Sequence, residues 1–171
     1  MNPRPLLQIW LRWLIALAAF ITVAACAANA QMVHHAFGFD TRYDGQEDVE
    51  VLDYRYGYDK NFVSAEEERV KQGRVFSFNN VHGDMLRGEF LYVKWRLKST
   101  GAVYEDKVDL RNRLPANIED HRITFLIRGP QLYVYLVPPE DVRRPKGKPP
   151  NGPHMYQYLD TVTLYPDSPK P

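Results

Sequence analysis

The stretch RITFLIRGPQLYVYLV at residues 122–137 decides the fold, because it reads as two strands that pair across a tight turn. Gly129 and Pro130 are typical turn residues and separate two runs of β-branched and aromatic residues. With the turn there, three apolar pairs face one another: Ile127–Leu132, Phe125–Val134 and Ile123–Leu136. The reverse face is also half apolar, so we expect another sheet, a loop or a partner to cover it.

A second hairpin is predicted between residues 91 and 110, with Ser99-Thr100-Gly101 at the turn. Apolar and polar residues alternate on both sides of this turn, and one register closes the apolar face with Leu97–Tyr104, Val93–Val108 and Leu91–Leu110. The same register sets Arg96 against Glu105 and places Asp106 beside Trp95 on the apolar face. A slip of one residue would set Val93 against Lys107.

The rest of the body adds further strands, expected at residues 33–39, 49–58, 75–78 and 156–165. Residues 138–153 hold six prolines and four basic residues, which predicts an exposed loop. One short helix is expected, with Ser64 as its cap, Glu67 and Lys71 four residues apart, and Gly73 at its end. The pattern therefore predicts an all-β fold, an antiparallel β-sandwich of about eight strands with one short helix.

The first thirty residues have the order of an export signal. Arg4 and Arg12 precede an uncharged run at residues 13–25, which ends at the small residues before Cys26. The run is shorter than the roughly 20 residues that a membrane-spanning helix needs. We therefore expect the body to be exported.

The sequence Val23-Ala24-Ala25-Cys26 resembles the lipobox of bacterial lipoproteins, although leucine is usual where Val23 stands. The resemblance implies that Cys26 becomes the lipidated first residue of the mature protein. Several acyl chains would make this attachment effectively permanent. Ala27 is not the aspartate that retains such proteins in the inner membrane, so the resemblance implies an outer-membrane anchor facing the periplasm.

A second cleavage site is also compatible with the sequence. Ala28-Asn29-Ala30 before Gln31 satisfies the pattern of an ordinary signal peptidase, and cleavage there would release a soluble periplasmic or secreted protein. On the favoured interpretation residues 1–25 are the signal, 26–32 a tether, 33–165 a single domain and 166–171 a flexible tail.

Charge and cysteine content exclude some classes of function. Removing Arg4 and Arg12 with the signal leaves 20 basic residues against 21 acidic ones, a net charge of −1. We do not expect a nucleic-acid partner, because a surface that binds phosphates normally carries an excess of basic residues. Cys26 is the single cysteine, so no disulfide forms within one chain.

No motif for a reaction, a metal or a cofactor stands out in the body. His34 and His35 are adjacent and would point to opposite faces of a strand, so both cannot hold one ion. His82-Gly83-Asp84 is most simply a turn between strands. There is no G-x-S-x-G, S-x-x-K or glycine-rich phosphate loop. We therefore expect no catalytic residues, no metal and no cofactor.

Tyrosines give the best indication of a binding face, because tyrosine provides rigid contact area that suits a peptide or a glycan. The candidates for this face are Tyr133 and Tyr135 with Tyr54, Tyr56 and Tyr58. Tyrosine is also an ordinary strand residue, so a structural role stands as the alternative.

Three functions fit these observations. The first is a non-enzymatic binding or assembly module, anchored in the envelope by its lipid and contacting an envelope protein or glycan. The second is an enzyme acting on envelope polymers, with carboxylates drawn from Asp84, Asp106 or Glu105. The third is a periplasmic inhibitor or immunity protein. The absence of catalytic motifs favours the first.

Overall fold

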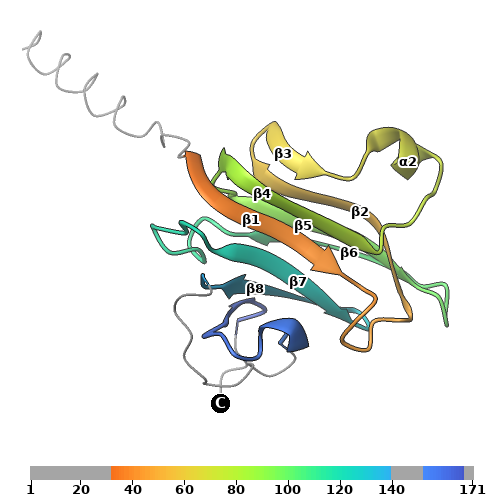
Figure 1. Cartoon of the computed structure of the whole chain (residues 1–171). Helices are drawn as coiled ribbons and strands as arrows, with labels where there is room; N and C mark the ends of the chain where they lie inside the picture. The colour runs from red at the N-terminus through yellow and green to blue at the C-terminus, as the bar shows by residue number, and fades with distance from the viewer. Residues whose placement is uncertain (1–31, 140–151, 168–171) are drawn as a thin grey trace, which may run out of the picture. The chain divides into compact units, whose positions relative to one another are not determined.

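A computed structural model describes residues 32–139 and 152–167 of the chain. Within these ranges nine strands form two sheets that stack face to face (Figure 1). The five-stranded sheet has the order β4-β1-β7-β8-β9 and the four-stranded sheet the order β3-β2-β5-β6. The elements are β1 (Met32–Asp40), β2 (Val49–Tyr58), β3 (Asn61–Ser64), α2 (Glu67–Lys71), β4 (Phe78–Leu86), β5 (Phe90–Leu97), β6 (Val103–Asp109), β7 (Arg122–Arg128), β8 (Gln131–Val137), the 3-10 turn η1 (His154–Tyr156) and β9 (Val162–Tyr165).

The predicted β-sandwich is confirmed, with one departure in strand direction. β1 and β7 pair in parallel, whereas all the other strand pairs of the described region are antiparallel. Alternating apolar residues fix which face of a strand is buried but not the direction of its neighbour, so the sequence pattern could not show this.

Aromatic side chains from both sheets fill the core between them. Phe37 of β1 stacks on Tyr56 of β2 with ring centroids 4.8 Å apart, and Phe39 stacks on Phe125 at 4.6 Å. Trp95 is 1% exposed and its indole nitrogen donates a hydrogen bond to the Gly129 carbonyl at 3.0 Å. The indole thus ties the four-stranded sheet to the turn of the β7–β8 hairpin.

The β7–β8 hairpin has the predicted register. Ile127 pairs with Leu132, Phe125 with Val134 and Ile123 with Leu136. Gly129 sits in the turn with a φ of 57°, a left-handed conformation that glycine adopts without steric cost.

The β5–β6 hairpin keeps the predicted parity but is shifted by two residues. Val93 pairs with Asp106, where Val108 was expected, and Leu91 pairs with Val108. The reason is the position of the turn: the Leu97 amide donates to the Ala102 carbonyl, so the four loop residues are 98–101, whereas the predicted register needs a turn centred one residue later. The alternation of apolar residues is compatible with any register that differs by two residues, and the position of the turn decides which one forms.

The shifted register gives the polar groups of this hairpin different partners. Glu105 lies opposite Lys94, while Arg96 donates to Glu50 of β2 at 2.8 and 2.6 Å. Asp106 is half-buried at the edge of the sandwich and accepts a hydrogen bond from the Tyr165 hydroxyl at 2.7 Å. This contact joins β6 to β9 across the two sheets.

Several predicted element boundaries were wrong. The strand expected at residues 75–78 runs from Phe78 to Leu86, and Phe76 makes only an isolated bridge to Val51. His82-Gly83-Asp84 therefore lies inside β4 and is not a turn. The short edge strand β3 was not predicted, because its four residues carry no clear alternation.

The last predicted strand was too long, and the helix lacks its predicted cap. Only Val162–Tyr165 is a strand, because residues 152–161 lie over the outer face of the five-stranded sheet. Ser64 ends β3, and the α2 cap position is Glu66, which makes no side-chain capping bond. The Glu67–Lys71 ion pair forms as predicted, at 3.1 Å.

Candidate functional site

The outer face of the five-stranded sheet carries a cavity of about 690 Å³, here called the outer pocket. Its floor is formed by β1, β4 and β7, and the C-terminal segment 152–159 forms one wall. This segment, blue in Figure 1, lies beside β8. It lies over the reverse face of the β7–β8 hairpin, where Leu126, Tyr135 and Val137 are at most 3% exposed. The expected cover over this face is thus part of the same chain.

Exposed apolar side chains gather around the outer pocket. Nine large hydrophobic residues of the described region are exposed, and four of them line this pocket: Tyr43, Phe78, Met155 and Tyr158, which are 51–67% exposed. Burying such side chains is favourable, so their concentration around a concave site indicates that a ligand covers them.

Polar groups occupy the floor between these apolar residues. Asp40, Asn80, Arg122 and Thr124 come from three neighbouring strands and line the pocket together. Even-numbered residues of β1 and β7 point to this face because side chains alternate along a strand. The floor therefore offers a carboxylate, an amide, a guanidinium and a hydroxyl within one sheet surface.

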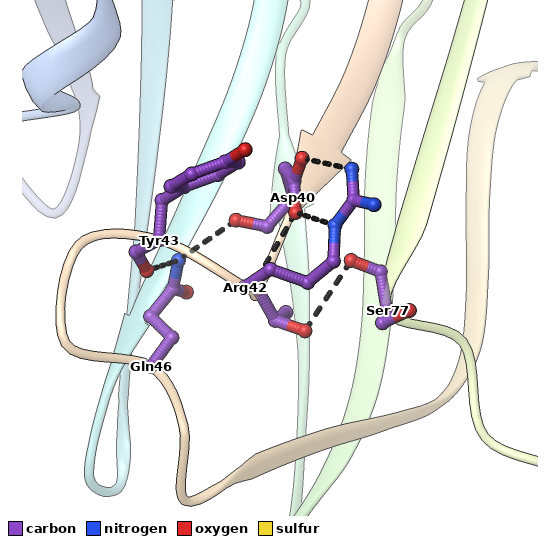
Figure 2. A network of polar contacts seen from close by, with 6 residues as sticks. Asp40, Arg42, Tyr43, Gln46 and Ser77 are labelled. Atoms are coloured by element: carbon purple, nitrogen blue, oxygen red, sulfur yellow. Dashed lines mark hydrogen bonds and ion pairs between the residues drawn. The ribbon is translucent and has the colours of Figure 1, made fainter.

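The carboxylate of Asp40 is already occupied. Arg42 donates to both of its oxygens, at 2.8 and 2.6 Å, as Figure 2 shows. These hydrogen bonds to the Arg42 side chain lower the pKa of Asp40 below its usual value. The Arg42 guanidinium also lies 5.0 Å from the centre of the Phe78 ring and 5.9 Å from that of Tyr43. The pairing of Arg42 with Asp40 therefore holds the guanidinium against the rings of Phe78 and Tyr43, which line the pocket.

Gln46 holds the β1–β2 loop against the sheet. Its amide nitrogen donates to the carbonyls of Asp40 and Tyr43, at 3.2 and 3.3 Å (Figure 2), and its amide oxygen accepts from the backbone of Ile127 at 2.8 Å. Gln46 is 1% exposed. The loop that presents Tyr43 to the pocket is therefore fixed to β7.

The C-terminal wall is attached to the same loop. The Asp44 carboxylate accepts a hydrogen bond from the His154 amide at 2.9 Å, at the start of η1. Leu159 is 7% exposed, and it anchors the wall on the sheet. Met155 and Tyr158, which flank these attachments, remain exposed.

A second cavity lies on the outer face of the four-stranded sheet, also of about 690 Å³. Three basic and three acidic side chains line it, and several of these charges are satisfied within the protein. Arg111 forms a bidentate pair with Asp109, and Lys107 lies 5.0 Å from the centre of the Phe90 ring. The balance of charges and the smaller apolar lining favour the outer pocket as the functional site.

The structure places most of the predicted tyrosine face in the interior, which corrects that prediction. Tyr54, Tyr56 and Tyr135 are 5%, 1% and 0% exposed. Tyr133 and Tyr58 are half-buried. Alternation assigned these residues to faces, but which faces are covered depends on how the sheets and the C-terminal segment pack.

The predicted histidine and carboxylate candidates do not converge on one cleft. His34 is exposed and contacts Asp84 at 3.0 Å, whereas its neighbour His35 is buried. Asp84 lies on β4 and Glu105 and Asp106 on β6, the edge strands of different sheets, and neighbours on one strand face opposite ways. Among the described residues, no group of three His, Cys, Asp or Glu could hold a metal ion.

The lining of the outer pocket was not predicted from the sequence. Its residues come from separate segments, and none of them belongs to a recognisable motif. The available signals were Phe78, which stands between Ser77 and Asn79, and the large apolar residues Met155 and Tyr158 that follow the prolines.

Cys26 and the export signal lie outside the described residues. No helix within residues 32–139 and 152–167 is long and apolar enough to cross a membrane. Comparison with protein-family models, with curated proteins and with solved structures found no match to this chain.

Proposed function

We propose that this chain is a non-enzymatic binding protein of the bacterial cell envelope, anchored by lipid on Cys26, which takes a short saccharide in the outer pocket. The single observation that carries the proposal is the gathering of Tyr43, Phe78, Met155 and Tyr158 around one polar floor.

This combination of groups suits a sugar better than a purely apolar ligand. Sugar rings have apolar C–H faces, which pack on aromatic side chains, and hydroxyl edges, which need hydrogen-bond partners. The pocket offers both, with aromatic side chains at its sides and amide, hydroxyl and charged groups on its floor. Its volume lies within the ordinary range for small-molecule sites, so a short saccharide segment fits.

The proposed location rests on the N-terminal sequence. Val23-Ala24-Ala25-Cys26 supports a lipid anchor, and Ala27 supports the outer membrane, with the domain facing the periplasm. Envelope glycans and the proteins that carry them are the partners available in that compartment. An anchored binding protein needs no catalytic group, in keeping with the scattered positions of Asp84, Glu105 and Asp106.

Two matched phenylalanine variants test the proposal. Phe78 lines the outer pocket and Phe62 lies on the other sheet, and each is exposed and lies near an arginine. The processed full chain, purified in detergent, is screened against defined oligosaccharides, and the tightest is titrated calorimetrically. We expect Phe78→Ala to weaken binding about 10-fold, in line with the 1–2 kcal/mol of a lost aromatic contact, and Phe62→Ala to bind as the wild type does.

Two results would overturn the proposal. One is the absence of binding to any oligosaccharide, and the other is an equal loss in both variants. Mass spectrometry of the recovered saccharide distinguishes binding from catalysis, because an enzyme acting on the polymer would return a shortened product.

A further inference from the structure

Arg122 lies on the floor of the outer pocket, and its side chain extends from β7 across β1 to β4. Its Nη1 donates to the Asn80 side-chain oxygen at 2.7 Å, although β1 lies between β7 and β4 in the sheet. The strand is crossed at Gly38, which pairs with Asn80 on one side and with Thr124 on the other.

Gly38 leaves the space for this crossing. A Cβ atom at this position would lie 3.2 Å from Arg122 Nη1 and only 2.5 Å from the backbone oxygen of Asn79. Any larger residue would therefore push against both the guanidinium and β4. The absence of a side chain at Gly38 lets the guanidinium lie across the pocket floor.

Arg122 has no ion-pair partner among residues 32–139 and 152–167. Among the described residues no carboxylate lies within 4.0 Å of its nitrogens, and Asn80 is the one hydrogen-bond partner. Three acidic residues of the described region line the pocket: Asp40 is paired with Arg42, Asp44 accepts the His154 amide, and Asp120 forms no ion pair with Arg122. A guanidinium has five N–H donors, so most of them are available to a ligand.

We infer that the ligand is an acidic saccharide and that Arg122 binds its carboxylate, with Asn80 fixing the orientation of the guanidinium. This inference rests on the proposed saccharide binding. The planar guanidinium matches a carboxylate with two parallel hydrogen bonds. Asp40, Asp44 and Asp120 also line the pocket, so a singly charged carboxylate is better tolerated there than a doubly charged phosphate.

The test compares three related disaccharides on the full chain in detergent. The first ends in a hexuronic acid, the second has that carboxyl group reduced to an alcohol, and the third carries a phosphate in its place. We expect wild-type protein to bind the acid about 10- to 100-fold tighter than the alcohol, the range of a charge-assisted hydrogen-bonded pair. The phosphate should bind less tightly than the acid.

Variants assign this preference to Arg122. Arg122→Gln should bind acid and alcohol equally, and an unfolding midpoint in urea close to that of the wild type shows that it is folded. Arg128→Gln, at the other end of β7 and outside the pocket lining, should keep the preference. If Arg122→Gln does not fold, Asn80→Ala replaces it and should reduce the preference several-fold, because the guanidinium loses its hydrogen-bond partner.

The outcomes separate this inference from the proposed function. Equal wild-type binding of acid and alcohol, or tightest binding of the phosphate, overturns the carboxylate assignment while saccharide binding stands. A preference that survives in Arg122→Gln also overturns it. Failure of all three disaccharides and of every other oligosaccharide to bind overturns both proposals.

Discussion

His34 and His35 are neighbours on β1 and have different surroundings. His34 is exposed, whereas His35 is 1% exposed and contacts the Val33 carbonyl through Nδ1 and the Tyr56 hydroxyl through Nε2, each at 2.8 Å. A carbonyl only accepts, so Nδ1 carries the proton and Nε2 accepts from Tyr56. The Tyr56 oxygen in turn accepts from the Gly88 amide at 3.1 Å. This chain of bonds satisfies the polar groups with a neutral imidazole.

Burial lowers the pKa of His35 below its ordinary value, because a charged imidazole loses its hydration in the core. In the unfolded chain the ring takes up a proton as pH falls through about 6.5, whereas in the folded protein it resists protonation. The unfolded state therefore binds more protons, and the free energy of unfolding should decrease as pH falls from 8 to 5. Urea unfolding at several pH values measures this slope.

The matched variant for this prediction is on the same strand. His35→Gln should have lower stability at pH 8 and a flatter dependence on pH, because the buried titrating group is gone. His34→Gln, on the exposed side, should keep the wild-type slope. Equal slopes for wild type and His35→Gln would contradict the assigned role of the buried imidazole.

At the level of elements, the β5 strand depends on Trp95. The indole is fully buried, stacks on Tyr104 and donates to the Gly129 carbonyl of the β7–β8 turn. Trp95→Ala should lower the free energy of unfolding by roughly 3–5 kcal/mol, enough to unfold many domains. Chemical denaturation measures the change, and a loss below about 1 kcal/mol would contradict the burial of this face.

The β8 strand gives a second prediction, on two tyrosines of one face. Tyr135 is fully buried on the outer face of the five-stranded sheet, and burial raises the pKa of its hydroxyl above the ordinary value. Tyr133 is half-buried on the same side of the strand. Tyr135→Ala should cost roughly 3–5 kcal/mol and Tyr133→Ala clearly less, measured by the shift in urea midpoint. Equal costs would contradict the difference in burial between the two positions.

For the whole molecule, the proposed lipid anchor on Cys26 gives a prediction about location. Cys26 follows Val23-Ala24-Ala25, so we expect metabolic labelling with a palmitate analogue in the wild type and none in Cys26→Ser. The variant should leave the membrane fraction, because in the proposed arrangement the acyl chains on Cys26 are the attachment to the membrane. A wild-type mature N-terminus at Gln31 would contradict the lipoprotein interpretation and support a soluble exported protein.

The sequence by itself determined the class of fold and the register of its clearest hairpin. In residues 122–137 both strands alternate and the turn residues are fixed, so only one pairing closes the apolar face, and the structure has that pairing. At residues 98–101 the sequence did not fix the centre of the turn, so the predicted parity was right but the register differed by two. A local sequence pattern can predict the pairing of a hairpin, because this pairing depends on residues that are close together in the chain.

Only the tertiary structure decided which faces are covered and where the pocket lies. Tyr54, Tyr56 and Tyr135 looked like contact residues, but Tyr54 and Tyr56 pack in the core between the sheets and Tyr135 is also fully buried. The pocket residues Tyr43, Phe78 and Arg122 are brought together by the parallel pairing of β1 with β7 and by the position of β4 beside β1. These contacts join residues about 35 to 80 positions apart, and such long-range pairings are set by burial of the whole core and not by any local pattern.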